Sequence, residues 1–505
     1  MTGPLNVPSR LRAIASRRGH QIALIDPWGH TTWTEMIDGM DGVAAALRGT
    51  GLAAGDRVAI AMEPSSTYVT VVLGALGAGL VPVPINTRLT PYEIAAFLEP
   101  IQPALVVTDH THVQTARATG YDVVVLAASH STTDLRARLA PLAGEPTVFA
   151  PVSEDSPAII FATGGTTGIP KGVWYDHRGL WLWLNASAAS NPGTRFDVEL
   201  YFAPFFHIAL GTNLLSRLFA GGTVHILRKF DAALALEAIA RGATRITGAP
   251  TMFAAIKSHE SFESTPRGSM RALRLGSMAA NADFIAQVML DYPTAAIRTG
   301  YGATEFGPLI GVEHEDLVAG RLTGIGRPHP GAEARILRAD GTEADCGEMG
   351  EIVVSAPWQS RGYWGRPDET EATYTAEGIR TGDLGAVDGD GWFSISGRLK
   401  EMVITGGENV FPTEVEDVLR RHEAVHDVIV YGVPDEYWGE RVEVGIVCAE
   451  GGDVELDELR EFARPYLAGY KLPKSLVRIR EVPLTTVQKP DRRAARAASI
   501  ESSSV

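Results

Sequence analysis

The segment TGGTTGIPKG, residues 163–172, separates two apolar stretches, 158–163 and 173–177, that have the composition of β-strands. Its glycines let backbone N–H groups turn toward an anion, and its threonine hydroxyls add donors. Lys171 supplies a mobile positive charge that suits phosphate. The spacing is not that of the P-loop of nucleotide hydrolases, because a proline precedes the lysine and a strand follows it. We predict a phosphate-binding loop between two strands; the alternative is a flexible hairpin loop.

Helix and strand patterns alternate on both sides of this loop, as in an α/β domain with a largely parallel sheet. The expected elements before the loop are helices 35–47 and 66–77 and strands 57–62 and 104–108. The expected strands from residue 158 to 298 and just beyond are 159–163, 199–203, 223–227 and 297–301.

The pattern changes twice toward the end of the chain. From 331 to 397 it becomes shorter, turn-rich and β-like, and after 397–400 a compact α+β unit begins. The elements expected in that unit are helices 413–421 and 456–466 and strands 427–433 and 441–449. The tail beyond 494 is expected to be disordered. We predict an α/β fold: a large N-terminal domain, 1–397, of two α/β sheet subdomains plus a β-rich subdomain, and a small mobile α+β C-terminal domain, 398–505.

Composition narrows the class of protein. The net charge of −15 over 505 residues argues against a general nucleic-acid or acidic-membrane surface. The apolar run 71–85 is interrupted by glycines and prolines and is too short to span a bilayer. Cys346 and Cys448 lie far apart, without the spacing of a metal site or a disulfide framework. We expect a cytoplasmic enzyme with no nucleic-acid partner and no integral membrane segment; a homodimer is left open.

The segment 163–172 resembles the phosphate-binding signature of the AMP-forming acyl-CoA synthetases, in the superfamily of adenylate-forming enzymes that includes luciferases and the adenylation domains of peptide synthetases. Gly164 stands where that signature usually has serine, and the backbone cradle is kept. The resemblance implies that ATP phosphates are bound by Thr163, Gly164, Gly165, Thr166, Thr167, Gly168 and Lys171.

Tyr301-Gly302-Ala303-Thr304-Glu305 resembles the family's Tyr-Gly-x-Thr-Glu motif. The resemblance implies that Tyr301 lies beside adenine, that Thr304 touches the α-phosphate and that Glu305 binds Mg²⁺. A carboxylate at the C-terminal end of a strand is also well placed for a cation beside a ligand; the alternative is a solvated loop glutamate. The other residues that the resemblance assigns to the nucleotide site here are Gly300, Ser277, Met278 and Ala279.

Four further segments extend the resemblance over nearly the whole chain. Thr381-Gly382-Asp383 is similar to the motif whose aspartate holds the ribose hydroxyls, although the preceding 378–380 is one residue shorter than usual and lacks a tryptophan. Read without the family, 381–383 is a turn. The segment 397–401 is similar to the interdomain hinge, which implies that Arg398 reaches the ribose and Lys400 lies at the pivot. Ile395 is assigned to the nucleotide site by the same resemblance.

Segment 406–412, with Gly406 and Gly407, is similar to the lining of the pantetheine tunnel. Read without the family, it is a β-hairpin turn before a helix capped through Thr413 and Glu416, and the two readings are compatible. Residues 482–489 resemble the loop of the adenylation lysine, with Gln488 in place of the usual glycine. Lys489 is thereby implied to bridge the substrate carboxylate and the α-phosphate; otherwise it reads as a surface lysine.

The acyl pocket is indicated by fewer residues. The segment 205–211 resembles the family's Phe-His segment, in which the histidine, here His207, borders the carboxylate; core packing of His207 is the alternative. Gly276 opens the 276–280 segment, which occupies the place of the family's loop beside adenine and substrate. Trp181 and Trp183 are expected in the core rather than in the pocket. Small residues that suggest room for a bulky apolar or cyclic acid are Ala209, Gly211, Ala279 and Gly302.

The resemblance implies an AMP-forming carboxylic acid:CoA ligase that uses ATP, Mg²⁺ and coenzyme A. A carboxylate would attack the α-phosphate of MgATP, release pyrophosphate and form an acyl-AMP, which a thiol then converts to a thioester. No Asp or Arg stands out for an amino acid's ammonium group, which disfavours amino-acid adenylation. Two alternatives stay open: an enzyme that stops at acyl-AMP or loads a carrier protein, and a non-catalytic homologue that binds acyl or nucleotide ligands.

Overall fold

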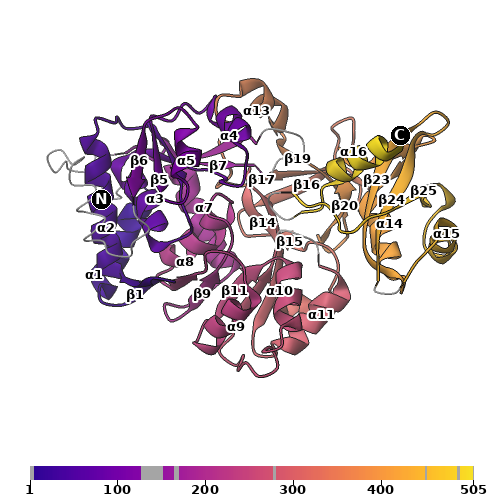
Figure 1. Cartoon of the computed structure of the whole chain (residues 1–505), viewed down its shortest axis with the longest axis horizontal. Helices are drawn as coiled ribbons and strands as arrows, with labels where there is room; N and C mark the ends of the chain where they lie inside the picture. The colour runs from indigo at the N-terminus through magenta and orange to yellow at the C-terminus, as the bar shows by residue number, and fades with distance from the viewer. Residues whose placement is uncertain are drawn as a thin grey trace. The chain divides into compact units, whose positions relative to one another are not determined.

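The computed structural model describes residues 5–126, 152–163, 170–276, 280–449, 452–485 and 489–503. They pack as two compact units (Figure 1). The first unit comprises the described residues up to 333 together with 354–379, and the second comprises 334–353 and the residues from 380 onward.

A four-stranded parallel sheet of order β4-β3-β5-β6 forms early in the first unit. Its strands are β3 (Arg57–Ala61), β4 (Val81–Pro84), β5 (Leu105–Asp109) and β6 (Val123–Leu126). The helices of this region are α1 (Val7–Arg18), α2 (Trp33–Gly49), α3 (Ser66–Ala78), α4 (Pro91–Leu98) and α5 (Val113–Arg117). Every residue of α3 is buried, as its nearly uniform apolar sequence requires. The expected parallel α/β arrangement is confirmed.

A nine-stranded sheet of order β15-β14-β13-β12-β11-β9-β10-β1-β2 forms the rest of the α/β core. Its strands are β1 (Ile22–Asp26), β2 (Gly29–Thr32), β9 (Val198–Tyr201), β10 (Thr223–Ile226), β11 (Arg245–Gly248), β12 (Ala272–Leu275), β13 (Ala296–Ala303), β14 (Gly307–Val312) and β15 (Arg327–Pro328). The six strands from β13 to β1 pair in parallel, and the strands at both edges are antiparallel. Strand β1 joins this sheet through β10, although the chain between them builds the four-stranded sheet.

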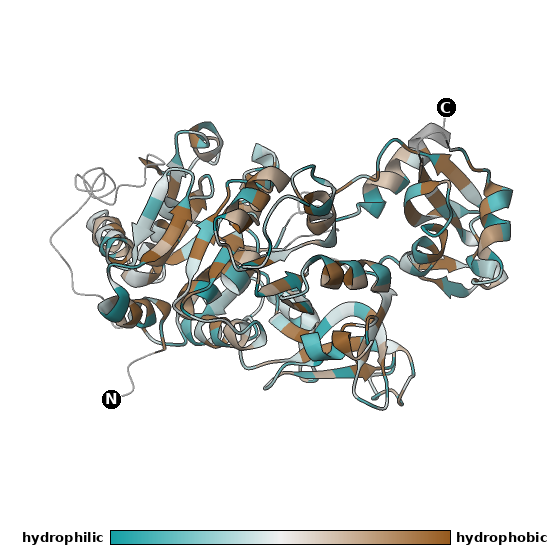
Figure 2. Ribbon diagram, turned by 90° about the horizontal axis from the view of Figure 1, so that it is seen from below, coloured by the Kyte–Doolittle hydropathy of each residue, from teal (hydrophilic) through white to brown (hydrophobic). Residues whose placement is uncertain are grey.

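Further helices lie between residues 177 and 318, after the strands of this part of the chain, and α9, α10 and α11 lie together beside β11 (Figure 1). They are α7 (His177–Ser190), α8 (Ser216–Phe219), α9 (Ala232–Ala240), α10 (Pro250–Ser258), α11 (Ala282–Asp291) and α12 (His314–Val318). Colouring by hydropathy shows apolar residues concentrated on the strands and polar residues on the outer sides of the helices (Figure 2). The first unit therefore has the helix-covered sheet architecture that the sequence predicts.

The strands predicted to flank 163–172 are β7 (Pro157–Ala162) and β8 (Gly172–Asp176), which form an antiparallel pair. The β-rich part has a five-stranded sheet of order β16-β17-β19-β18, with β20 on β19. Its strands are β16 (Glu333–Leu337), β17 (Gly350–Ser355), β18 (Tyr374–Thr375), β19 (Gly378–Val387) and β20 (Phe393–Arg398). Helix α13 (Pro367–Thr373) precedes β18.

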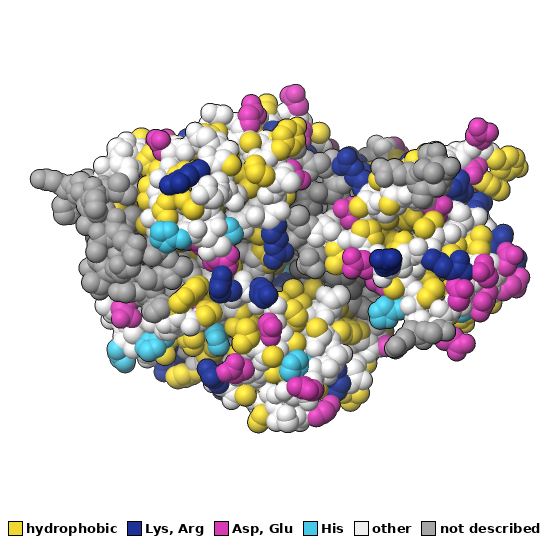
Figure 3. Space-filling view, viewed as in Figure 1, with side chains coloured by type: hydrophobic (Ala, Val, Ile, Leu, Met, Phe, Trp, Pro, Cys, Tyr) yellow, Lys and Arg dark blue, Asp and Glu magenta, His cyan; other side chains and the backbone are white. Residues whose placement is uncertain are grey.

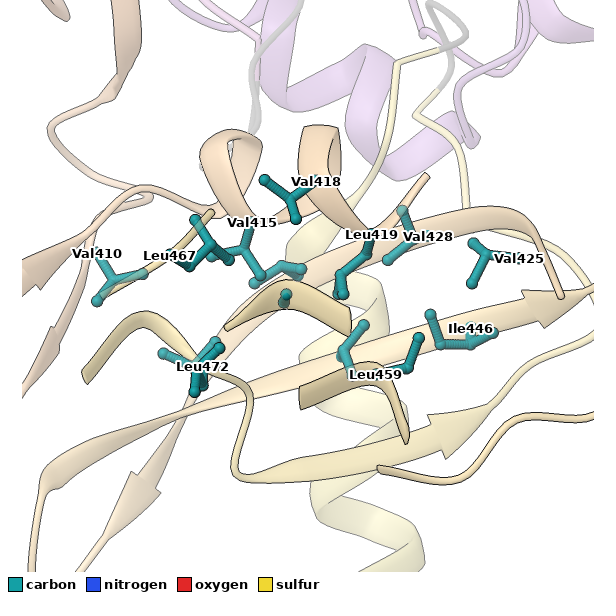
Figure 4. Packing of buried hydrophobic residues seen from close by; sticks show 14 of the residues in the cluster. Val410, Val415, Val418, Leu419, Val425, Val428, Ile446, Leu459, Leu467 and Leu472 are labelled. Atoms are coloured by element: carbon teal, nitrogen blue, oxygen red, sulfur yellow. The ribbon is translucent and has the colours of Figure 1, made fainter. Parts of the chain in front are cut away.

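The C-terminal part of the second unit contains a five-stranded sheet of order β22-β21-β24-β23, with β25 on β24. Its strands are β21 (Val403–Thr405), β22 (Glu408–Val410), β23 (Val425–Asp435), β24 (Gly439–Cys448) and β25 (Ser475–Arg478). Its helices are α14 (Pro412–Leu419), α15 (Leu456–Ala463), the 3₁₀ turn Gly469–Lys471 and α16 (Arg492–Ser503). Figure 4 shows side chains of α14, α15 and the strands meeting in one apolar core.

Acidic and basic side chains lie close together on the surface of α15 in this unit. Over α15, basic and acidic side chains alternate (Figure 3), and two arginines there pair with acids three residues away, Arg460 with Asp457 and Arg464 with Glu461. Such exposed helix pairs contribute only a few tenths of a kcal/mol each. The face is therefore an ordinary solvated helix surface.

The prediction of a disordered tail beyond 494 is wrong, because α16 continues to Ser503. Ala495 is buried in an apolar cluster with Ile429 and Tyr431 of β23, and the Ser499 hydroxyl hydrogen-bonds to Glu443 of β24. The sequence of α16 has few large apolar residues, so its packing surface consists of small side chains that a composition argument overlooks.

Arg492, the first residue of α16, joins four segments of the second unit. Its guanidinium contacts both carboxylate oxygens of Glu416 at 2.8 Å, lies 2.9 Å from Glu401 and donates to the Val430 carbonyl. Glu416 is only 2% exposed, and burial raises its pKa although Arg492 and Arg420 act in the opposite direction. A carboxylate in this position needs its cation to remain charged.

We expect Arg492→Gln to destabilise the second unit by about 3–5 kcal/mol near neutral pH, because it leaves Glu416 without its main cation. The pKa of Glu416 is higher in the folded protein than in the unfolded chain, so stability falls as pH rises through the interval between the two values. Removing Arg492 raises the folded-state pKa of Glu416 further, so the loss of unfolding free energy should be larger at about pH 8 than at about pH 5. Urea unfolding at both pH values measures this, with exposed Arg493→Gln as the matched control; equal losses at the two pH values would contradict it.

Candidate active site

Two groups of the predicted site residues, 164–168 and 277–279, lie outside the described residues. The others are distributed over both compact units. Thr163, Lys171, His207, Ala209, Gly276 and residues 300–305 belong to the first unit, and Asp383, Ile395, Arg398, Lys400, Gly406, Gly407 and Lys489 belong to the second.

The two ends of the predicted phosphate loop are held together at the top of the β7–β8 hairpin. The Thr163 N–H donates to the Lys171 carbonyl at 2.9 Å, and the Lys171 N–H donates to the Thr163 hydroxyl at 3.0 Å. Residues 361–364 run along the other edge of β8, where Trp364 N–H donates to the Gly172 carbonyl at 2.7 Å. The position of Lys171 is thus fixed from two sides.

Glu305 lies just beyond the end of β13, as the strand-end argument predicts. The main chain on both sides of its peptide bond is bound: the Tyr175 hydroxyl donates to the Thr304 carbonyl at 2.8 Å, and the Ser360 N–H donates to the Glu305 carbonyl at 2.9 Å. The Tyr363 hydroxyl donates to a Glu305 carboxylate oxygen at 2.9 Å. Glu305 is therefore an ordered, half-buried carboxylate and not a solvated loop residue.

Tyr363 links Lys171 to Glu305. The Lys171 ammonium lies 4.5 Å from the centre of the Tyr363 ring, a cation–π distance, while the hydroxyl of the same ring binds Glu305. Burial, together with the nearby Glu305 carboxylate, raises the pKa of Tyr363, so the hydroxyl stays protonated and remains a donor. The structure brings Lys171 and Glu305, far apart in sequence, into one constellation.

A second partner of Lys171 is Glu369 in the first turn of α13, which forms an ion pair with its ammonium. The hydrogen bond from Lys171 lowers the pKa of Glu369. Sequence reasoning missed both Tyr363 and Glu369. The segment 361–370 contains no spacing that signals a ligand site, and only its place beside β8 reveals the role of these side chains.

Glu305 suits the kind of metal ion that the resemblance implies. Mg²⁺ usually takes one or two protein carboxylates and completes its shell with water and substrate phosphates. Across the described ranges no group of three or more His, Cys, Asp or Glu side chains has the geometry of a metal site. A single carboxylate, Glu305, joined through Tyr363 to a lysine fits this mode of binding.

In the second unit, Asp383 and Arg398 are cross-strand partners on β19 and β20. The Arg398 Nε donates to an Asp383 carboxylate oxygen at 3.0 Å, and Asp383 is only 6% exposed. The segment 381–383 is therefore part of a strand and not the turn that its sequence suggests by itself. Ile395, on the same strand as Arg398, is 37% exposed.

The chain leaves β20 through a turn at 399–401, in which Leu399 N–H donates to the Gly382 carbonyl at 2.8 Å. Gly406 and Gly407 then form the two-residue turn of the β21–β22 hairpin, both with positive φ, 60° and 85°. The hairpin reading is confirmed. The predicted helix start is also confirmed, because α14 begins at Pro412. Its side-chain cap is wrong: Thr413 donates to the Ser396 carbonyl instead, and Glu416 binds Arg492.

Lys489 closes a short loop whose ends are hydrogen-bonded. Thr485 N–H donates to the Lys489 carbonyl at 2.7 Å, and Lys489 N–H donates to the Thr485 hydroxyl at 3.2 Å. Asp491 N–H donates to the Pro483 carbonyl at 2.7 Å, just before α16. The loop therefore presents Lys489 from a fixed base next to the Arg492 network.

Two of the small residues read as pocket space are instead required by packing. A Cβ on Gly211 would lie 2.5 Å from the indole of Trp183, and one on Gly302 would lie 2.3 Å from the Gly307 carbonyl oxygen. Trp183 is fully buried, in agreement with the core prediction. The size of Gly211 and Gly302 is thus explained without an acyl group.

His207 begins an unusual segment. Its Nδ1 accepts from the Ala209 N–H at 3.2 Å, so the proton of the neutral ring lies on Nε2. A π-helical turn, Leu210–Leu215, follows directly. Such turns are rare and often mark functional positions, and nothing in the sequence pattern predicted this one.

Two family models match the chain: the AMP-binding enzyme model over residues 11–364 and the AMP-binding enzyme C-terminal domain model over residues 414–489. A feruloyl-CoA synthase from Amycolatopsis sp is 35% identical over 457 residues, which are 90% of this chain and 91% of that protein. ScoC of Streptomyces coeruleorubidus, a fatty acid–[acyl-carrier-protein] ligase, is 31% identical over 466 residues, 87% of this chain and 86% of its own length.

Among solved structures, ATP-bound MatB from Rhodopseudomonas palustris matches with a TM-score of 0.89 and 29% identity, over 98% of this chain and 99% of that chain. The match supports the combination of mixed α/β sheets with a smaller C-terminal domain that the sequence predicts.

Gly302→Ala should destabilise the first unit by about 1–3 kcal/mol, because the new methyl group collides with the main chain of β14. Gly276→Ala is the matched control, since a Cβ there meets no heavy atom within 4 Å. Thermal unfolding of the two variants measures the difference. An unchanged unfolding midpoint for Gly302→Ala would contradict the packing explanation and would indicate that Gly302 is small because a ligand needs the space.

Proposed function

The chain belongs to the AMP-binding enzyme family, and we propose that it is an AMP-forming carboxylic acid:CoA ligase. In the first half-reaction an acid and ATP give acyl-AMP and pyrophosphate. In the second, acyl-AMP and CoA give acyl-CoA and AMP. That the protein is an enzyme is shown by its family and its relatives; the reaction and the residue roles below are proposed.

The proposal rests on one observation: beside the loop that connects β7 and β8, the Tyr363 ring contacts the Lys171 ammonium and its hydroxyl binds Glu305. A lysine, a carboxylate and the ends of a glycine-rich loop together provide what a magnesium–polyphosphate needs. No protein nucleophile is required, because phosphoryl chemistry of this kind depends on in-line positioning and charge neutralisation.

In adenylation, an oxygen of the substrate carboxylate attacks the α-phosphorus, and the bond from that phosphorus to the bridging oxygen of pyrophosphate breaks. Lys171 and the loop residues 163–168 bind the β- and γ-phosphates, and Thr304 touches the α-phosphate. Glu305 would hold Mg²⁺, which neutralises phosphate charge when bound. Lys489 bridges the reacting oxygens, while Tyr301, Gly300, Ala303 and 277–279 surround adenine.

Asp383 and Arg398 are proposed to hold the ribose, with Ile395 beside the nucleoside. A carboxylate can accept hydrogen bonds from both vicinal hydroxyls, and the direct contact from Arg398 holds Asp383 in place for this. Because Lys489 belongs to the second unit and Lys171 to the first, adenylation requires the two units to bring these lysines to one nucleotide.

In thioester formation, the CoA sulfur attacks the acyl carbonyl and AMP leaves with the former carboxylate oxygen. We propose that residues 398–505 rotate as a mobile domain against 1–397 between the half-reactions, with Lys400 as pivot. A few changes of φ and ψ in the turn at 399–401 would absorb this rotation. Gly406 and Gly407, exposed at the tip of their hairpin, would then approach the pantetheine arm.

For the acid, we propose a bulky apolar or cyclic carboxylic acid bordered by His207, Ala209, Gly276 and Gly302, where Gly302 contributes main chain and is small because of its packing against Gly307. The support comes from the feruloyl-CoA synthase relative, whose named product carries an aromatic acyl group. His207, with its proton on Nε2, can donate to the substrate carboxylate. The carrier-protein ligase relative keeps a second candidate open, transfer of the acyl group to a carrier protein.

A cytoplasmic location remains part of the proposal. Within the described ranges, the chain contains no helix whose length and apolar character would let it cross a bilayer.

The experiment that tests the function is pyrophosphate release from MgATP with a panel of aromatic, alicyclic and fatty acids, with CoA, with a carrier protein and with neither. We expect release with at least one acid and formation of its CoA thioester. Thioester on the carrier protein only would favour the second candidate. ATP binding without pyrophosphate release for any acid would favour a non-catalytic homologue.

Lys489→Ala should slow acyl-AMP formation by about 10²–10³, because it removes a positioned cation from the reacting oxygens. Thioester formation from supplied acyl-AMP should change little. The two half-reactions are measured separately, and Arg493→Ala, an exposed cation on the neighbouring turn, is the control. Normal pyrophosphate release by Lys489→Ala would remove Lys489 from the adenylation step.

A further inference from the structure

Glu369 lies between two cations. One carboxylate oxygen pairs with the Lys171 ammonium, and the other accepts from the Arg366 guanidinium at 2.8 Å. Arg366 is three residues before Glu369, just ahead of α13, so this second pair is local to one turn of chain. The pair with Lys171, in contrast, connects α13 to the phosphate hairpin.

The Lys171–Glu369 pair is accessible and therefore exchangeable. The two side chains are 31% and 36% exposed, in a range where ion pairs contribute little net stability and water competes with them. A magnesium–polyphosphate offers Lys171 more negative charge than one carboxylate. The Tyr363 ring is a second contact of the ammonium, 4.5 Å from its centre, and does not depend on the carboxylate of Glu369.

Release of Lys171 leaves no unbalanced charge behind. Glu369 keeps Arg366, and Lys171 keeps the face of Tyr363. Tyr363 is itself held in place, since its N–H donates at 3.0 Å to the hydroxyl of Thr370, the residue after Glu369. Thr370 also binds the Arg366 carbonyl at 2.8 Å, so 363–370 forms one hydrogen-bonded platform beneath Lys171.

We propose that Glu369 is the internal counter-ion of Lys171, which exchanges this carboxylate for a phosphate when nucleotide binds and returns to it when pyrophosphate leaves. Glu369 is thus a positioning residue that acts through Lys171 and sets the affinity for phosphates. This inference rests on the proposed function, in which Lys171 binds the β- and γ-phosphates. The competition weakens the hold on ATP and pyrophosphate and so favours departure of the product.

A purely structural role is the competing explanation, in which Glu369 only attaches α13 to the hairpin. The two explanations differ in sign. A structural tie predicts that loss of the carboxylate disorders the platform and weakens phosphate binding. An exchanging counter-ion predicts that loss of the carboxylate frees Lys171 and tightens phosphate binding.

The experiment measures binding of MgATP and of magnesium pyrophosphate by calorimetry to the full chain, without any acid. Glu369→Gln keeps the side-chain shape and removes its charge. Asp368→Asn is the matched control, because Asp368 is an exposed acid in the same first turn of α13 and makes no ion pair among the described residues. Both substitutions change the net charge and the helix-terminus electrostatics equally.

We expect Glu369→Gln to bind both probes about two- to five-fold more tightly, the size of an exposed ion pair, and Asp368→Asn to match the wild type. In a Lys171→Ala background the added Glu369→Gln should have no effect, because the coupling passes through the lysine. Thermal unfolding and the KM for ATP provide second readouts, with an unchanged unfolding midpoint and a lower KM expected.

Unchanged or weaker binding by Glu369→Gln overturns the proposal in favour of a structural tie. Tightening that persists in the Lys171→Ala background, or that Asp368→Asn reproduces, overturns it in favour of general charge repulsion. Failure of the wild type to bind MgATP would instead refute the proposed function, so the two failures are distinguishable.

Discussion

In the proposed function, a chain with a net charge of −15 binds a polyphosphate, so it has to place local cations against a repulsive background. Lys171 meets this requirement without being left unpaired in the free protein, because Glu369 and the Tyr363 ring both contact its ammonium. The same ring carries the hydrogen bond to Glu305. The arrangement of the proposed phosphate site in the first unit therefore follows from how one lysine is held.

The hairpin that carries Lys171 depends in turn on segments that come from elsewhere in the chain. Strand β8 pairs with β7 on one side and with the backbone of 361–364 on the other. The second of these contacts brings Tyr363 under the lysine and places Ser360 against the main chain of Glu305. A single strand thus aligns residues that the sequence separates widely.

The glycines of the predicted site segments are required for two different structural reasons. At 406 and 407 it supplies positive φ in a tight hairpin turn. At 211 and 302 it lets a buried indole or a neighbouring strand approach closely. Only the first use leaves space at the surface for a ligand, so small residues in a motif are not by themselves evidence of a pocket. The second unit shows the converse error, since the small residues of its last helix form a packing surface.

Motif spacing and strand–helix alternation were enough to predict the α/β class, the two strands that flank 163–172 and the placement of Glu305 at a strand end. These features depend on local backbone preferences and on residue types within one short segment. Other features depend on contacts between distant segments. No periodic or compositional pattern in the sequence indicates the pairing of β1 with β10. The same is true of the platform that contains Tyr363 and Glu369 and of the hydrogen bonds and ion pairs of Arg492. Each of these residues acquires its role from a neighbour that only the folded sheet brings within hydrogen-bonding distance, and tertiary structure alone decides that neighbour.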